Sequence, residues 1–282
     1  MLFKKGFLVF IVLTVIVGLS GCGKKETALE GDAASQPAKP VVNPGEMVLV
    51  PAGEFIIGTD TKGSDGKESA AYPQHKVNLP AFWIDKYEVT NYQMLDFSIK
   101  ERYAGEGAKE GKDWRLFATP DKALFPVQYI TWNDANAYCK SVGKRLPTEA
   151  EWEKAARGPD GKAYPWGNDW VDNRSNTAET GIVKPVAVGE FDDVSQYGAH
   201  DMLGNVREWT STLFELYPGH PKQKDNPGKG RYVVRGLSPN HKGKIVRLWD
   251  RDAMPAAYLG DIGCRCAKDA TPEDVAKAAQ AK

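Results

Sequence analysis

Cysteine and histidine are the residues of this chain best suited to thiol chemistry or to binding a soft metal ion. The four cysteines of the 282-residue sequence are Cys22, Cys139, Cys264 and Cys266. The four histidines, scattered along the chain, are His75, His200, His220 and His241. Thiolate ligands select Cu(I), whereas imidazole also suits zinc and iron. Cys264 and Cys266 lie two residues apart and are poorly placed to form a disulfide with each other.

An export signal is expected at the N-terminus. Lys4 and Lys5 precede an apolar run at residues 7–17, which is shorter than the roughly 20 residues of a membrane-spanning helix. The next stretch, Leu-Ser-Gly-Cys at residues 19–22, resembles the lipobox of bacterial lipoproteins, whose cysteine is acylated and becomes the first residue of the mature chain. We therefore expect residues 1–21 to be a lipoprotein signal peptide and Cys22 to be the lipidation site. The alternative is an ordinary signal peptide with a chance cysteine.

The residue after Cys22 bears on the location of the protein. By resemblance to lipoprotein sorting, Gly23 in place of an aspartate favours an outer-membrane lipoprotein of the cell envelope, facing either the periplasm or the cell surface. Compartments outside the cytoplasm are oxidising, so at least one disulfide is expected among the remaining cysteines.

The overall composition excludes several classes of protein. The chain is 41% apolar, which is too much for wholesale disorder, and its 37 Lys and Arg balance 37 Asp and Glu. A chain with no excess of positive charge lacks the main source of affinity for nucleic acid, so no nucleic-acid partner is expected. With 28 Gly, 18 Pro and 8 Trp, the composition favours a loop-rich, aromatic-cored domain.

The pattern of apolar residues predicts one tethered domain. Residues 22–45 have no apolar period and are expected to form a disordered tether, residues 46–270 the folded domain, and residues 271–282 a flexible tail. Apolar runs predict strands at 47–51, 53–58 and 82–85, the first two as arms of a hairpin. Helices are expected after Thr90, after Thr131 and after Thr148, the last with a capping box to Glu151. Regular patterning thins out beyond Gly158.

A series of ordered motifs resembles the formylglycine-generating enzyme family, also called sulfatase-modifying factor domains. The segments that carry this resemblance are 47–55 (MVLVPAGEF), 84–91 (IDKYEVTN), 137–139 (AYC), 143–153 (GKRLPTEAEWE), 164–168 (YPWGN), 201–209 (DMLGNVREW), 235–236 (RG) and 263–266 (GCRC). They span about residues 46–268. The resemblance implies an α+β fold of the irregular formylglycine-generating-enzyme type, related to C-type lectins and low in regular secondary structure.

The same resemblance bears on catalysis. Oxidase members of the family bind copper through two cysteines, a few residues apart, shortly before the closing Gly-x-Arg-Cys. Here the corresponding stretch, Arg235 to Arg247, contains no cysteine, and His241 alone cannot provide a two-coordinate thiolate site. No catalytic residue is therefore assigned, and no copper is expected. Ergothioneine-type iron catalysis is also disfavoured, because the second helical domain that supplies its histidines is missing.

The resemblance further implies a structural disulfide and a calcium site. Cys139 and Cys266 match the disulfide of the family, which leaves Cys264 either as a buried, inert thiol or as a reactive one. The calcium loop of the family is matched by the carboxylates of Asp201 and Glu208 and the carbonyls of Gly204 and Val206. A second family site resembles Asn173 with the Arg174 carbonyl, with Glu179 as a possible third ligand. Calcium takes six to eight oxygen ligands, and its expected role is structural.

Three functions remain open on the sequence alone. The favoured hypothesis is a binding or assembly subunit of an envelope protein complex, held to the membrane by its lipid anchor. The alternative is an oxidase acting on exported protein cysteines, or another oxidoreductase using the same cleft, so the sequence leaves enzymatic activity undecided but favours its absence. A glycan-binding module is the third, because lectin-like folds use calcium and tryptophan to bind sugars.

Overall fold

The computed structural model describes residues 42–62, 66–107, 111, 113–222, 224 and 226–280. The expected signal peptide at 1–21, the lipidation site Cys22 and most of the expected tether lie outside the described residues. No helix in the part of the chain that the structure describes combines the length and the apolar character needed to cross a membrane.

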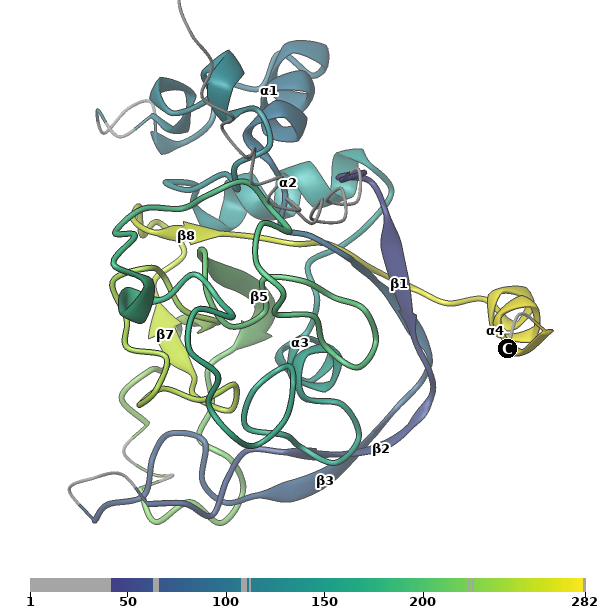
Figure 1. The fold of residues 1–282 in the computed structure, drawn as a ribbon, viewed down its shortest axis with the longest axis vertical. Helices are drawn as coiled ribbons and strands as arrows, with labels where there is room; N and C mark the ends of the chain where they lie inside the picture. The colour runs from purple at the N-terminus through teal and green to yellow at the C-terminus, as the bar shows by residue number, and fades with distance from the viewer. Residues whose placement is uncertain are drawn as a thin grey trace, which may run out of the picture. The chain divides into compact units, whose positions relative to one another are not determined.

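The first four strands form one long, bent two-armed ribbon (Figure 1). One arm is β1 (Met47–Val50) followed by β2 (Gly53–Ile57), and the other is β3 (His75–Leu79) followed by β4 (Phe82–Asp85). β1 pairs with β4 and β2 pairs with β3, both antiparallel. The predicted hairpin between β1 and β2 is therefore wrong. A tight hairpin needs residues with positive φ in its turn, which the intervening Pro51 and Ala52 do not favour.

Two further sheets complete the strand topology. β9 (Ala267–Asp269) pairs with β4, giving a three-stranded sheet in the order β1-β4-β9. The four-stranded sheet runs β7-β6-β5-β8 and consists of β5 (Arg207–Leu213), β6 (Tyr232–Arg235), β7 (Asp252–Met254) and β8 (Ile262–Gly263). β8 pairs with β5 in parallel, while the other pairs in this sheet are antiparallel.

Threonine capping boxes start three of the helices. These are α1 (Asn91–Lys100), α2 (Trp132–Ser141) and α3 (Glu149–Arg157). In each, the threonine hydroxyl accepts the N–H of the third helical residue, and that residue's side chain accepts the threonine N–H. The pairs are Thr90–Gln93, Thr131–Asp134 and Thr148–Glu151. The capping box expected at Thr148 is thus confirmed. The fourth helix, α4 (Pro272–Gln280), has no buried residue.

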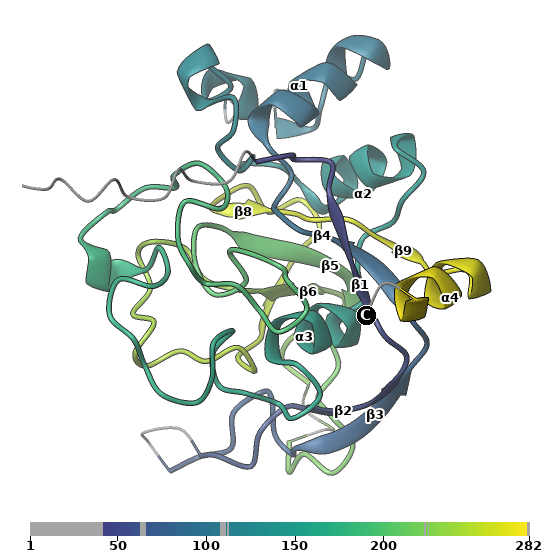
Figure 2. The same ribbon diagram turned by 45° about the vertical axis from the view of Figure 1, so that its right-hand side comes forward.

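The two largest of the four apolar clusters in the described part of the chain hold most of these elements together. One lies between α1, α2 and the four-stranded sheet and contains the fully buried Trp209. The other joins α3 to the β1-β4-β9 sheet, with Trp152 of α3 in the same cluster as Phe82 and Ile84 of β4. Figure 2 shows α3 in front of β5 and β6, with α1 and α2 stacked at one end. The end of β5 near residue 208 therefore lies between both cores.

The chain between α3 and β5 is mostly irregular, as expected. Over residues 158–206 the one regular element described is the short 3-10 helix η4 (Ala178–Thr180). Two more 3-10 turns, η2 (Trp114–Leu116) and η3 (Pro120–Lys122), lie between α1 and α2. The predicted α+β fold with little regular secondary structure is confirmed.

One disulfide joins the C-terminal strand region to α2. Cys139 of α2 is bonded to Cys266, 127 residues further along the chain, which confirms the expected pairing. Cys264 is a free cysteine and is buried.

Removal of this bridge is expected to destabilise the domain strongly. In the chain-entropy model, a cross-link that spans 127 residues stabilises the fold by about 4–5 kcal/mol. We therefore expect the double substitution Cys139→Ser, Cys266→Ser to lower the free energy of unfolding by about that amount in urea titrations of the full-length protein. Cys264→Ala is the matched control, because it also changes a buried cysteine but keeps the bridge. Equal losses in the two variants would contradict this account of the disulfide.

Candidate functional site

A buried ion pair between Arg265 and Glu208 forms the centre of the predicted calcium region. The Arg265 Nε donates to Glu208 Oε2 and its Nη2 to Glu208 Oε1, both at 2.8 Å. The exposed fraction is 0% for the Arg265 side chain and 1% for the Glu208 side chain. Trp152 Nε1 donates a further hydrogen bond of 2.8 Å to Glu208 Oε2. Both oxygens of Glu208 therefore already have donors within the protein.

Three more carboxyl groups are buried around this pair. Burial raises the pKa of Glu88 well above its usual range, and the charges of Asp201 and Glu208 raise it further. Burial likewise raises the pKa of Asp201, and the nearby charge of Asp193 raises it further. Burial also raises the pKa of Asp193, to about 6. Arg265 lowers the pKa of all three acids but does not offset the effect of burial. Four buried carboxyl groups thus share one guanidinium.

The loop at residues 201–208 is held in place by these acids. Glu88 Oε1 accepts the Val206 N–H at 3.0 Å, and Glu88 Oε2 accepts from the Asn205 side chain at 2.7 Å. Asp193 Oδ1 accepts the Asp201 N–H at 2.8 Å, and Asp201 Oδ2 accepts the Gly189 N–H at 2.6 Å. A divalent cation in this region would favour the ionised forms of these acids and offset the cost of their burial.

Glycine is required at the centre of this loop. A Cβ on Gly204 would lie 2.4 Å from the Asn176 carbonyl oxygen, so no larger residue fits there. Among the described residues, no three or more His, Cys, Asp or Glu side chains are grouped as metal ligands. A calcium ion in this loop would therefore depend on backbone carbonyls, such as those of Gly204 and Val206, as well as on carboxylates.

At the second predicted site, the side chains of Arg174 and Glu179 have partners within the protein, while the Arg174 carbonyl stays a predicted ligand. Asn173 is exposed and adopts a positive φ of 58°. Arg174 pairs with Asp192, with its Nη2 3.2 Å from the carboxylate. Glu179 accepts the N–H groups of Gly243 and Lys244, both at 3.0 Å.

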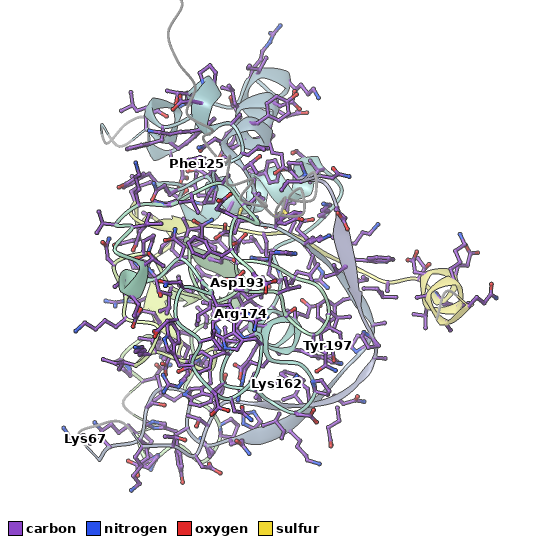
Figure 3. The ribbon with its side chains drawn as sticks, in the orientation of Figure 1. Lys67, Phe125, Lys162, Arg174, Asp193 and Tyr197 are labelled. Atoms are coloured by element: carbon purple, nitrogen blue, oxygen red, sulfur yellow. A yellow bond between two sulfur atoms is a disulfide. The ribbon has the colours of Figure 1, made fainter. Side chains whose placement is uncertain are left out.

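Sequence reasoning missed Asn176 in the same region. This side chain is 1% exposed, and its Nδ2 donates to Lys184 O and Asn205 Oδ1. Its Oδ1 is buried without a partner. Figure 3 places Asp193 in front of β5, and the hydroxyl of Ser175, next to Asn176, donates to it at 2.8 Å. Asn176 lies in a polar stretch, Arg-Ser-Asn-Thr, which carries no local sign of burial.

The stretch without cysteines surrounds a small polar cavity. Ser238 and His241 contact each other, with Oγ and Nδ1 2.8 Å apart. Ser238 also bonds Asp261, whose carboxylate accepts from Arg207 Nη2 at 2.5 Å. A cavity of about 160 Å³ is lined by His241, Arg207 and Asp252 among others. The side chains that line it offer imidazole, carboxylate and guanidinium groups but no thiolate.

The remaining thiol lies far from solvent. Cys264 is fully buried in the core that also contains Cys139 and Cys266. Burial raises the pKa of the Cys264 thiol well above its usual range, and the charges of Glu208 and Asp85 raise it further. The neutral thiol is neither a nucleophile nor a good copper ligand.

Comparison with known proteins identifies the family of this architecture. The family model described as sulfatase-modifying factor enzyme 1-like domain matches residues 32–270. The mouse protein named inactive C-alpha-formylglycine-generating enzyme 2 is 31% identical over 79% of this chain and 86% of its own length. The Streptomyces coelicolor formylglycine-generating enzyme is 31% identical over 84% of this chain and 94% of its own length.

Two solved structures show the same fold. PvdO from Pseudomonas aeruginosa matches with a TM-score of 0.61 and 24% identity, covering 82% of this chain and all of that one. Treponema denticola variable protein 1 matches with a TM-score of 0.61 and 21% identity, covering 83% of this chain and all of that one.

The burial of Cys264 leads to a labelling prediction. We expect iodoacetamide at pH 8 to leave Cys264 unmodified in the folded full-length protein and to alkylate it fully in denaturant, because the thiol is both inaccessible and protonated. Peptide mass spectrometry gives the modified fraction. The variant Ser141→Cys places a thiol at an exposed position at the end of α2 and is the positive control. Alkylation of Cys264 at the rate of that control would show it to be a reactive thiol.

Proposed function

Because the chain belongs to the family of sulfatase-modifying factor enzyme 1-like domains, we propose that it is a lipid-anchored binding or assembly subunit of an envelope protein complex. The observation that carries this proposal is the absence of cysteine from residues 235–247, where oxidase members have their copper ligands. The family itself leaves the activity open, since the relatives include both a protein named inactive and proteins named formylglycine-generating enzyme.

The chemistry available at this stretch argues against the oxidase alternative. Two-coordinate binding of Cu(I) requires soft ligands, and His241 is the one nitrogen ligand that the stretch supplies. Its Nδ1 is already in contact with the Ser238 hydroxyl at 2.8 Å. Cys264 cannot replace the missing copper ligands, because its thiol is fully buried in the core. The scaffold therefore supports binding better than redox catalysis.

The proposed anchor determines where such binding takes place. Acylation of Cys22 would hold the protein at the outer membrane, and the expected tether at residues 22–45 would connect the lipid to the domain. A flexible linker of this length has an end-to-end distance of about 25 Å. A domain held this close to the bilayer would meet other membrane proteins at high effective concentration, which favours a role in assembly.

A calcium ion is proposed as a structural part of this domain. Asp201 would supply a carboxylate, and Gly204 and Val206 would supply carbonyl oxygens. Glu208, the other predicted carboxylate ligand, is bonded to Arg265 and Trp152 instead. The support is the group of buried acids around a single arginine, which includes Glu88 and Asp193. Such an ion would order the irregular chain that precedes β5. The proposal concerns this loop alone. At the second predicted site Asn173 is exposed, and Glu179, its possible third ligand, already accepts two backbone N–H groups.

Calcium is expected to raise the thermal stability of the full-length protein in detergent. At 100 times the dissociation constant, a ligand that binds only the folded state stabilises it by about 2.7 kcal/mol. For a domain of this size, that corresponds to a rise in Tm of roughly 5–10 °C over the value in EGTA. Asp201→Asn is expected to reduce the rise, whereas Asp172→Asn, at an exposed carboxylate, should keep it. Identical melting curves in EGTA and calcium would contradict the proposal.

The assembly role is tested by purification from the native membrane. We expect the tagged, cross-linked full-length protein to bring the same envelope proteins with it in a fixed ratio over repeated preparations. Cys22→Ala is the control for anchoring and is expected to move the protein out of the membrane fraction. Two results would overturn the proposal: purification of the protein alone, or copper-dependent oxygen consumption with a cysteine-containing sulfatase peptide.

A further inference from the structure

A groove of about 580 Å³ lies between α4 and the edge of the β1-β4-β9 sheet. We call it the β1 groove. Leu49 and Pro51 line it from the strand side, and Tyr197 lines it from the irregular chain before β5. α4 provides the third side and lies beside β1 in both ribbon views (Figures 1 and 2), while Figure 3 places Tyr197 next to the strand. None of the functions described above uses this groove.

The backbone of β1 has unpaired hydrogen-bonding groups at this edge. The Lys86 N–H donates to the Glu46 carbonyl oxygen at 2.9 Å, which makes these two opposed residues a hydrogen-bonded pair. Such pairs alternate with non-hydrogen-bonded ones along an antiparallel ladder, so Leu49 and Trp83, three positions further on, form a non-hydrogen-bonded pair. The N–H and carbonyl of Leu49 therefore point away from β4. Among the described residues they have no hydrogen-bond partner.

The other end of β1 has the same arrangement. Met47 lies opposite Asp85, whose N–H donates to the Cys266 carbonyl at 2.8 Å and therefore faces β9 rather than β1. Met47 thus directs its own N–H and carbonyl to the same free edge as Leu49. An edge with a row of unpaired N–H and C=O groups is a template for a further strand.

The side chains around the groove favour an uncharged occupant. Of the described residues that line it, none has an ionised side chain. Burial and the charge of Asp160 raise the pKa of Tyr197, so its hydroxyl stays protonated and can form hydrogen bonds. An ionised group that entered the groove would lose hydration without gaining an opposite charge.

The α4 side of the groove is an apolar helix face. Val275, Ala278 and Ala279 all line the groove, and their spacing of three and four residues places them on one side of the helix. Val275 is 42% exposed, and no residue of α4 is buried. An amphipathic helix ordinarily buries its apolar stripe against another element. Here the stripe faces the open groove, so an occupant would complete its packing.

An extended peptide would satisfy both features of the groove. Its backbone would pair with the free groups of Met47 and Leu49, and alternate side chains would fill the space next to α4. A helix or a lipid acyl chain could cover the apolar surface but would leave the N–H and carbonyl of Leu49 without partners. Burying such groups unpaired is unfavourable, so strand pairing is the favoured mode of binding.

We propose that the β1 groove binds an extended, uncharged segment of a partner protein, which is added to the sheet as a strand next to β1. Pro51 ends the pairing, because proline has no N–H and its carbonyl already accepts from the Lys154 ammonium at 2.8 Å. The added strand is therefore short and pairs with residues 47–50. This inference rests on the proposed function, because the partner is a member of the envelope complex.

Alternate N-methylation of a peptide tests the strand pairing. The probe is acetylated Thr-Val-Thr-Val-Thr with fluorescein on an added C-terminal lysine, and fluorescence anisotropy measures its binding to the full-length protein in detergent. Successive N–H groups of a strand point to opposite sides. We therefore expect N-methylation of either the two valines or the last two threonines to weaken binding about tenfold or more, while the other set changes it less than about twofold. Equal effects of the two sets would overturn the proposal, since apolar contact alone would not distinguish them.

Leu49→Pro tests the same pairing from the side of the protein. The substitution removes the N–H that faces the groove but breaks no bond between β1 and β4, and proline is tolerated at such edge positions. We expect it to weaken the valine–threonine peptide by about tenfold or more. The thermal melting curve of the variant shows whether it is folded. Unchanged affinity in the folded variant would overturn the proposal.

A charge on α4 locates the peptide in the groove. Ala278→Asp places a carboxylate in the lining without disturbing a buried residue of the helix, and it is expected to weaken the peptide by about tenfold or more. Ala276→Asp makes the same change at an exposed position of α4 outside the lining and should leave binding unchanged. This pair keeps the test valid even where Leu49→Pro fails to fold. Equal affinity in the two α4 variants would overturn the proposal.

The groove and the assembly role can fail separately. A native complex that keeps its composition with Ala278→Asp would overturn the groove proposal and leave the assembly role standing. A protein that purifies alone yet binds the peptide through the groove would overturn the assembly role and support the strand pairing. Self-association of the full-length protein that Ala278→Asp abolishes would make a second copy of the chain the occupant, which would overturn the assignment to another protein.

Discussion

The buried guanidinium of Arg265 is the interaction on which most of this structure depends. Beyond its paired bonds to Glu208, Arg265 donates to the backbone carbonyls of Asp85, Lys86 and His200. It thereby joins the end of β4, the irregular chain before β5, and β5 itself. A buried charge that loses its partner costs about 3–5 kcal/mol, so these segments are stable only in their joint arrangement.

The residues on either side of Arg265 reinforce the same junction. A Cβ on Gly263 would lie 2.3 Å from the Val127 carbonyl oxygen, so only glycine fits at that position. Cys266 forms the disulfide to α2, and its N–H donates to Asp85 Oδ2 at 2.9 Å. Each residue of the closing Gly-Cys-Arg-Cys motif therefore contributes to the packing of this junction.

The scaffold and the candidate binding surfaces are spatially separate. The ion pair, the disulfide and both cores lie in the interior, whereas Lys184, Asn240 and the stretch around His241 belong to irregular segments at the surface. Loops on a rigid scaffold can change their chemistry without a cost to the core. The same fold can thus carry different sites in different proteins.

Local rules were sufficient for part of this protein. The capping box at Thr148 follows from residue types a few positions apart, and the motif series carried the fold class and the pairing of Cys139 with Cys266. The capping box depends on one short stretch of sequence, and the fold class and disulfide pairing depend on the order of several short motifs. The sequence by itself also determined that no copper thiolate pair can form at residues 235–247, since absent cysteines cannot be supplied by folding.

Tertiary structure decided the features that join distant segments. β1 pairs with β4 rather than β2 because strand partners depend on the whole ribbon and not on the apolar run alone. Glu208 has its oxygens occupied by Arg265, 57 residues away in sequence, and Asn176 is buried although its neighbours in sequence are polar. The cavity of about 280 Å³ beside Ser238 joins residues from five separate stretches of chain. Burial and charge balance depend on which segments meet in three dimensions, and only the folded chain brings them together.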